Sequence, residues 1–259
     1  MKKILAFTAL IFTSIFAFAM TDQEKLLKLA EDNTAFYDKD FKANYSIVQE
    51  KPGQGKSSTE AIMYRRDSES KWVILLTGPA KDKGKGYLQS DNTIWFFDPA
   101  DKRFTFTSAK DKFQGSNANN SDFTPQKYYS GYNIESTEKV TLGKFDCTLF
   151  TLKAKTDNVD YPMLKIWVTE DGLVRKKEDY SLSGTLLRTT AVPSYQKVTE
   201  KKQDIYVPSK MLITDNLRGK KIGEKVQYER TQVTITNVSF ASQPATVYTK
   251  QYLEMMSVK

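Results

Sequence analysis

The chain has 259 residues, a formal net charge of +8, no histidine and one cysteine. Without histidine it lacks the usual general base of Ser-His and Cys-His hydrolases and the commonest neutral zinc ligand. One cysteine excludes an internal disulfide and a CxxC redox pair. A hydrophobic content of 39% with 27% charged residues is typical of a folded, soluble protein.

The N-terminus has the pattern of a secretory signal. Lys2 and Lys3 precede an apolar run from Ile4 to Phe18, which ends in a small-x-small pattern at Ala19. The run is short for a membrane span, although an uncleaved N-terminal anchor is the alternative. We expect residues 1–19 to be a signal peptide cleaved after Ala19, and residues 20–259 to form a single exported domain.

The segment after the signal begins with a helix. Thr21 and Glu24 form a capping box, and apolar residues follow at helical spacing, which predicts a helix from about Asp22 to Tyr37. From Phe41 onward, short runs rich in Val, Ile, Thr, Phe and Tyr alternate with turn signals about every ten residues. This spacing predicts a large antiparallel meander.

Several runs alternate apolar and polar residues, which is typical of strands with one wet and one dry face. Apolar residues occupy odd positions at Val233 and Ile235 but even positions at Val238 and Phe240, and this change at Asn237 predicts a bulge there. Pro208 interrupts a strand-like run and predicts an edge strand or a bulge. A closing turn of helix is expected over residues 247–254.

Between Lys110 and Tyr132 the strand pattern stops. An Asn/Ser/Gly-rich stretch is followed by Thr124-Pro125, which predicts the start of a short aromatic helix. We interpret this insert as a lid or plug; a surface crossover without a ligand role is the alternative.

Motifs for catalysis or cofactor binding are incomplete in this sequence. The stretch from Gly53 to Ser57 resembles the end of a phosphate-binding loop, but Glu50 stands where the first glycine is required. The acids are scattered, and Cys147 shares a strand face with apolar residues, as a buried thiol would. Since these motifs are missing, we expect no metal and no cofactor. Basic residues are interleaved with acids, so we also expect no nucleic-acid partner, with weak attraction to anionic lipid headgroups as a minor alternative.

The aromatic content of the strands suggests binding rather than catalysis. Much of it must be core, but a large curled sheet can also enclose a hydrophobic cavity. Burial of an acyl chain in such a cavity would yield about 0.8 kcal/mol per methylene group.

A series of short segments resembles the bacterial outer-membrane lipoprotein-sorting (LolA-like) proteins over about residues 24–254. They are, in order, Thr93-Ile94-Trp95-Phe96-Phe97-Asp98-Pro99, Gly115-Ser116 with Ser121-Asp122-Phe123, Gly184-Thr185-Leu186-Leu187-Arg188, Val207-Pro208-Ser209-Lys210-Met211, Asp215 with Gly219-Lys220, and Tyr248 to Glu254. The sequence departs from the family pattern where residues 117–120 split the Gly-Ser-Asp-Phe stretch.

The resemblance implies a mainly β fold, a curved incomplete antiparallel barrel with a few helices as a lid over a hydrophobic cavity. It also implies a lid-bonding arginine, for which Arg65 or Arg66 is the nearest candidate. The implied lid residues are Leu27, Ala30, Phe123 and Tyr128. The implied lipid-binding wall residues are Trp72, Trp95, Phe97, Phe104, Phe106, Ile166 and Val168.

The functional expectation is a monomeric, non-enzymatic periplasmic carrier of the acyl chains of lipoproteins or lipids. The resemblance implies an inner-membrane release complex and an outer-membrane acceptor as partners. The alternative is an envelope sensor or protein-interaction module with the same fold and no transport. An envelope enzyme is a third interpretation, motivated only by scattered Asp and Tyr.

Overall fold

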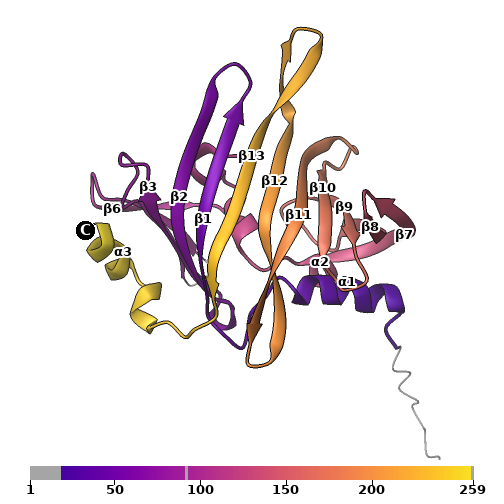
Figure 1. Ribbon diagram of the computed structural model, residues 1–259, viewed down its shortest axis with the longest axis horizontal. Coiled ribbons are helices and arrows are strands. Elements are labelled where there is room, and N and C mark those ends of the chain that lie inside the picture. Colours follow the sequence, from indigo (N-terminus) through magenta and orange to yellow (C-terminus); the bar gives the residue numbers. More distant parts are fainter. Residues whose placement is uncertain (1–18, 91–92, 258–259) are drawn as a thin grey trace, which may run out of the picture.

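The alternating residues that predict strands from Phe41 onward form one antiparallel sheet (Figure 1). The computed structural model describes residues 19–90 and 93–257, so the predicted signal peptide lies outside the described residues except for Ala19. Within these ranges the strands are β1 (Phe41–Lys51), β2 (Gly55–Arg66), β3 (Lys71–Gly78), β4 (Gly86–Ser90), β5 (Thr93–Asp98), β6 (Arg103–Thr107), β7 (Tyr132–Leu142), β8 (Phe145–Ala154), β9 (Met163–Val168), β10 (Val174–Tyr180), β11 (Leu186–Glu200), β12 (Gln203–Ile222) and β13 (Lys225–Ser239).

Helices are few and short. The α-helices are α1 (Asp22–Asp32), α2 (Tyr128–Gly131) and α3 (Lys250–Ser257), and short 3-10 helices are η1 (Asp67–Glu69), η2 (Phe113–Gly115), η3 (Asn120–Phe123) and η4 (Ala245–Tyr248). The capping box at Thr21 and Glu24 is confirmed, but α1 ends five residues before the predicted end. Asn33 donates its backbone N–H to the Leu29 and Glu31 carbonyl oxygens and so closes the last turn.

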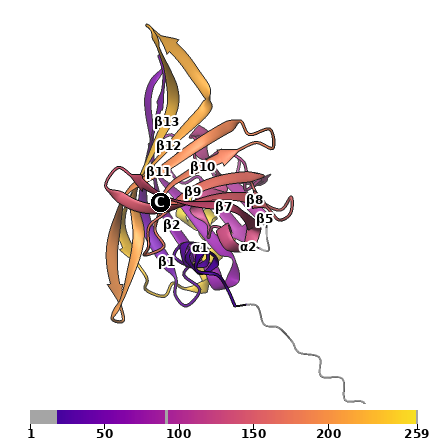
Figure 2. The same cartoon turned by 90° about the vertical axis from the view of Figure 1, so that its right-hand side faces the viewer.

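The strand order is β6-β5-β4-β3-β2-β1-β13-β12-β11-β10-β9-β8-β7. The first and last strands in sequence therefore pair in the middle of the sheet, and β6 and β7 are its two open edges. The sheet bends strongly, and α1 and α2 lie against one side of it (Figure 2). The predicted fold class, a curved and incomplete antiparallel barrel with few helices, is confirmed.

Both predicted irregularities occur. Asn237 has a positive φ of 53°, and the register between β1 and β13 gains one residue on β13 beside it. The register between β11 and β12 shifts near Pro208, which is a bulge in an interior strand rather than an edge.

Apolar side chains are buried on both faces of the sheet. On the concave face, one cluster gathers around Phe41, Met63 and Phe113, and a second, with Phe150 and Ile166, lies under α1. On the convex face, η4 and α3 cover β2 to β5, with Leu253 at the centre of a third cluster. Within the described ranges, no helix is long and apolar enough to cross a membrane.

The insert between β6 and α2 lies inside the curve of the sheet. Phe113, Ala118 and Asn120 have none of their surface exposed. The alternative of a surface crossover is therefore wrong. The predicted helix at Thr124-Pro125 is also wrong, since η3 ends before Thr124 and α2 begins only at Tyr128.

Candidate functional site

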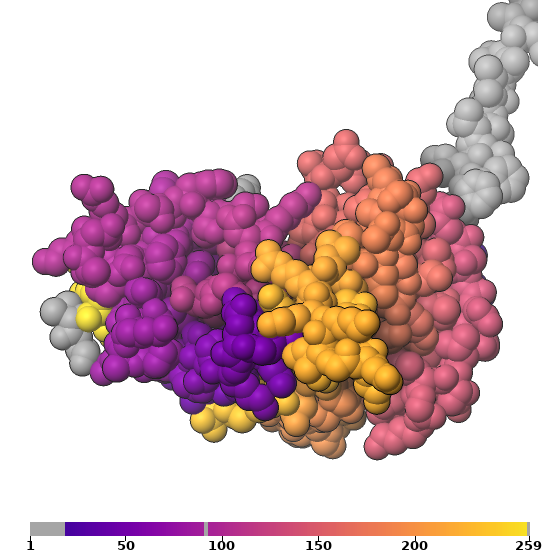
Figure 3. Space-filling view, turned by 90° about the horizontal axis from the view of Figure 1, so that it is seen from above, coloured from indigo at the N-terminus to yellow at the C-terminus, as the bar shows by residue number. Residues whose placement is uncertain are grey.

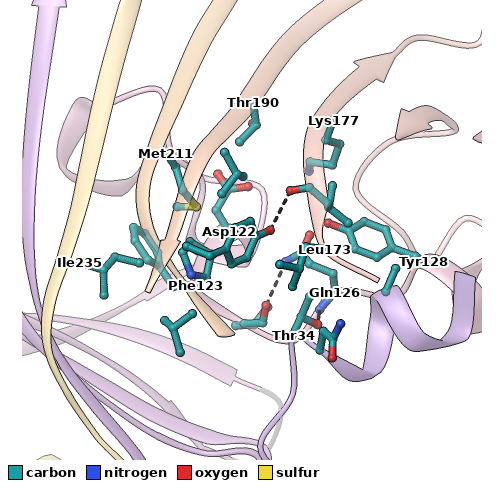
Figure 4. A pocket seen from close by; sticks show the side chains of 18 of the residues that line it. Thr34, Asp122, Phe123, Gln126, Tyr128, Leu173, Lys177, Thr190, Met211 and Ile235 are labelled. Atoms are coloured by element: carbon teal, nitrogen blue, oxygen red, sulfur yellow. Dashed lines mark hydrogen bonds between the residues drawn. The ribbon is translucent and has the colours of Figure 1, made fainter. Parts of the chain in front are cut away.

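An apolar cavity of about 120 Å³ lies on the concave side, between the sheet and the segment that joins η3 to α2 (Figure 4). The strands β1, β11, β12 and β13 supply its wall through apolar side chains. These include Tyr45, Val192, Val207, Met211, Ile213 and Ile235. Ala30, Phe123 and Tyr128 line the side opposite the wall.

A second, more polar cleft of about 360 Å³ lies on the other side of the same segment. Its lining includes Trp72, Gln89, Asp160 and Tyr161. Four residues line both spaces: Thr124, Gln126, Tyr128 and Lys177. The chain from Asn120 to Tyr128, here called the partition, therefore separates the apolar cavity from the polar cleft.

The partition is anchored by its own sequence and by aromatic packing. Asn119 and Asp122 form a capping box that starts η3. Phe123 then lies 5.7 Å from the ring of Tyr45 and 4.9 Å from that of Phe113, both edge-on. Such contacts contribute about 0.5–1.5 kcal/mol each beyond the area they bury.

A buried arginine on β11 holds the partition to the sheet. Arg188 donates from Nη1 and Nη2 to the carboxylate of Asp122 at 2.5 and 2.9 Å, and from Nε to Asp179 at 2.8 Å. It also donates to the Asn117 carbonyl oxygen at 3.3 Å. We call Arg188, Asp122 and Asp179 the inner ion cluster; its side chains are almost fully buried.

The charges of this cluster support one another. Burial opposes ionisation of Asp122, but the positive charges of Arg188 and Lys177 outweigh it and lower the pKa of that carboxyl. Burial likewise opposes the charge on Arg188, and the two carboxylates outweigh it and raise its pKa. Asp122 and Arg188 are therefore ionised, and separating them would leave a charge unpaired in a buried place.

A second set of bonds ties α1 to α2, and the partition to the residues that follow α1. Glu31 accepts hydrogen bonds from the backbone N–H groups of Tyr129 and Ser130 at 2.7 and 2.9 Å. The Gln126 N–H donates to the hydroxyl of Thr34 at 2.8 Å. Helix α1, the partition and α2 are thus bonded to each other as well as to the sheet.

Arg65, one of the two arginines suggested by the family resemblance, reaches this assembly. Its Nη2 donates to the Thr34 carbonyl oxygen at 2.9 Å, and a bidentate pair with Asp67 fixes its guanidinium. It also lies over the rings of Phe36 and Phe41. Arg66 instead pairs with Asp40.

Of the predicted wall residues, none lines the apolar cavity. Phe97 and Phe104 pack on the convex face with Leu253, and Trp95 lies under Lys250, whose Nζ is 3.7 Å from the ring centroid. Phe106 is 71% exposed. The placement of these four residues in the cavity wall was wrong: η4 and α3 give Trp95, Phe97 and Phe104 a second dry face that alternation alone does not distinguish, and Phe106 is exposed.

The remaining predicted wall residues do lie on the concave face. Trp72 is buried and donates its indole N–H to Gln89 at 2.6 Å, beside the polar cleft. Ile166 and Val168 are fully buried under α1. They are packed against helix rather than against open space.

The predicted lid residues are brought together. Leu27 and Ala30 lie on the buried face of α1, and Ala30, Phe123 and Tyr128 line the cavity. Burial raises the pKa of the Tyr128 hydroxyl well above its ordinary value, so this group stays neutral.

Sequence reasoning missed the inner ion cluster. Its members come from η3, β10 and β11, and single charged residues in strands are read as solvated by default. The only signal was that Asp122 and Arg188 both fall inside segments that resemble the lipoprotein-sorting proteins. Their convergence depends on the register of β10 with β11, which places Asp179 opposite Arg188.

Within the described residues, no group of three or more acidic or cysteine side chains could hold a metal ion. Cys147 is buried, as predicted, and burial raises the pKa of its thiol.

Several solved structures share this architecture. A LolA superfamily protein from Nitrosomonas europaea has a TM-score of 0.70 at 20% identity, covering 90% of this chain and 100% of its own. A domain assigned to the outer membrane lipoprotein-sorting proteins, from Vibrio parahaemolyticus, has a TM-score of 0.72 at 16% identity, covering 89% and 97%. The fold is LolA-like.

A DUF1329 family protein from Desulfovibrio piger also has a TM-score of 0.72, at 17% identity, with 89% and 98% of the two chains covered. In sequence, a family model described as "Uncharacterized protein" matches residues 68–255, and the chain belongs to that family. No protein with a curated description matches it. At these identities, the LolA-like structures establish the fold alone.

Proposed function

We propose that the protein is a periplasmic carrier that binds the acyl chains of lipoproteins or lipids in the cavity beneath α1 and the partition. The observation that carries this proposal is the apolar lining of that cavity on the concave face of a LolA-like sheet. Burial of a fatty acyl chain stabilises a complex by roughly 10 kcal/mol, at about 0.8 kcal/mol per methylene group. Binding by area needs no catalytic group.

The size of the cavity sets a condition on this function. A volume of about 120 Å³ is close to the roughly 150 Å³ of a protein cavity that takes up benzene. It can hold the end of an acyl chain and no more. Loading therefore requires the partition to move, which joins the apolar cavity to the polar cleft beside it.

The geometry supports a fixed strand wall and a partition that can move. The strand wall is continuous, whereas the partition is held by a small number of discrete contacts at Asp122, Phe123 and Gln126. A segment held in this way can be displaced without unpairing a strand. Apolar wall residues would then contact the acyl chain, and the polar cleft would receive its ester or amide end.

The test uses neighbouring residues on opposite faces of β12. Met211 lines the cavity, whereas Leu212 is 42% exposed on the convex face. Binding of a fluorescent fatty acid and of a synthetic diacylated lipopeptide is measured for Met211→Glu and for Leu212→Glu, with urea unfolding as the check of folding. We expect Met211→Glu to weaken binding at least tenfold, since a carboxylate in an apolar site is strongly unfavourable.

Equal binding by wild type and Met211→Glu would contradict the assignment of the cavity. Recovery of a protein partner that neither probe displaces would favour the alternative, a sensor that uses the concave face for a peptide. Native mass spectrometry of protein purified from the bacterial envelope would identify the natural cargo.

A further inference from the structure

Two hairpins rise beyond the rest of the sheet at one end of the molecule (Figure 1). One is the hairpin of β1 and β2, and the other is the long hairpin of β12 and β13. In Figure 3, which looks down on this end, the indigo and amber tips lie side by side. A Cβ atom at Gly53 would come within 2.9 Å of Lys220 Nζ, so the two tips are in contact. Residues 50–58 and 217–230 are together called the hairpin tips.

The hairpin tips carry a concentrated positive charge. They contain seven Lys or Arg residues and three Glu residues, a net charge of +4 against +8 for the entire chain. Among the described residues, no carboxylate lies within ion-pair distance of Lys220, Lys221 or Lys225. Arg218, by contrast, forms an ion pair with Asp215, with 3.6 Å between Nε and Oδ2. The three lysines are exposed, and their charge is available to a partner.

The same tips expose apolar side chains. Leu217 is 62%, Ile222 39% and Val226 53% exposed. In the hairpin, Ile222 pairs with Lys225 and Lys221 pairs with Val226, so each apolar side chain lies beside a lysine on its own face. Apolar groups flanked by lysine at a narrow projecting end are suited to the boundary between phospholipid headgroups and acyl chains.

A break in the strand register separates the tips from the rest of the sheet. Between Thr214 and Gly219 the register of β12 against β13 shifts by several residues, and Asp215 accepts hydrogen bonds from the N–H groups of Leu217 and Arg218. Gly219 packs closely against the facing strand: a Cβ atom there would lie 2.6 Å from Val226 Cγ1, so a larger residue would displace that side chain. The hydrogen bonds to Asp215 thus fix the local backbone around the exposed Leu217.

We propose that the hairpin tips dock the protein on an anionic phospholipid surface, with the lysines near the headgroups and with Ile222 and Val226 inserted between them. Complementary charge favours a membrane that contains anionic lipid, and exposed apolar side chains flanked by lysines match its headgroup boundary. The strands β12 and β13 extend from the cavity wall, through the irregularity at residues 214–219, to the tips. Docking would therefore present the cavity at a fixed distance from the bilayer.

The chain offers a matched control, because β12 has an adjacent lysine pair at each end. Lys220 and Lys221 lie in the tips, and Lys201 and Lys202 lie in the turn at the opposite end, up to about 60 Å away along the strand. Lys220→Glu/Lys221→Glu and Lys201→Glu/Lys202→Glu change the net charge equally. All four side chains are exposed, and urea unfolding checks that both variants fold.

Binding is measured by co-sedimentation with vesicles of phosphatidylcholine alone or mixed with phosphatidylglycerol. We expect the wild type to prefer the anionic vesicles and to be released by about 1 M salt, where the Debye length is about 3 Å. Each lysine near an anionic surface favours binding about fivefold. The tip variant should therefore lose at least about 25-fold in affinity, while the opposite-end variant stays close to wild type.

Insertion is tested separately with an environment-sensitive fluorophore on a single cysteine. In a Cys147→Ala background, a label at Ile222→Cys should shift to shorter wavelength with anionic vesicles, and a label at Gln203→Cys should not. Equal loss by both lysine variants, no preference for anionic vesicles or no shift at residue 222 would each overturn the proposal. Displacement by poly-glutamate that vesicles cannot reverse would assign the tips to an acidic protein instead.

This surface does not depend on what the cavity holds. Met211→Glu, which blocks the cavity under the proposed function, should bind anionic vesicles as the wild type does. Failure of acyl-chain binding and failure of membrane docking are thus separate results.

Discussion

The inner ion cluster predicts how strongly the partition is held. Asp122→Asn keeps the shape of the side chain and removes the charge that pairs with Arg188 at 2.5 and 2.9 Å. A hydrogen bond to a charged group contributes about 1.5–3 kcal/mol, and both partners are buried, so that solvent screens the pair little. A loss of about 2 kcal/mol raises the population with the partition displaced about 30-fold, if the rest of the sheet is unaffected.

The measurement is hydrogen exchange of the peptide that spans residues 117–128, together with the rate at which a fluorescent fatty acid enters. Both should increase in Asp122→Asn. The control is Asp204→Asn, which breaks an exposed ion pair between Asp204 Oδ2 on β12 and Lys197 Nζ on β11, 3.0 Å apart. An exposed pair contributes little, so exchange and uptake should stay unchanged. If the Asp122→Asn variant behaved like this control, the partition would not be held by the cluster, and the reasoning would be refuted.

Three further predictions concern stability and access. Hydrogen bonds from Arg66 lower the pKa of Asp40, and the charge of Arg188 lowers the pKa of Asp122 against the effect of burial. Both carboxylates therefore stabilise the folded state fully above the unfolded pKa of about 3.9. This stabilisation is lost as the pH falls through the lower folded pKa values. With no histidine to titrate, the urea midpoint should be flat from about pH 5 to 8 and should fall below about pH 4; a transition near pH 6 would contradict this. Phe123→Ala should lower the free energy of unfolding by about 3–5 kcal/mol in a denaturant titration while enlarging the cavity for the fatty-acid probe, and a loss below about 1 kcal/mol would show that the partition barely packs. The Cys147 thiol should react with Ellman's reagent only as fast as the protein opens, because it is buried and its pKa is raised; prompt reaction in the folded state would count against the buried placement.

The local pattern of the sequence was sufficient for much of the fold. The capping box at Thr21 starts α1, the alternation from Phe41 onward produces the meander, and the change of parity at Asn237 is a bulge. These features depend on interactions between residues close in the chain. The order of short segments added the family resemblance, and with it the curved and open shape.

The tertiary structure alone decided which face of each strand is concave. Trp95 and Phe97 sit on a strand that is apolar on both faces, and they face outward because the distant helix α3 covers them. The inner ion cluster and the hairpin tips were hidden for the same reason. Asp122 meets Arg188 across 66 residues, and the basic excess becomes a local surface only where two hairpins far apart in sequence lie together. Composition determined that the chain carries positive charge and no histidine, but the pairing of β1 with β13 determined where that charge gathers.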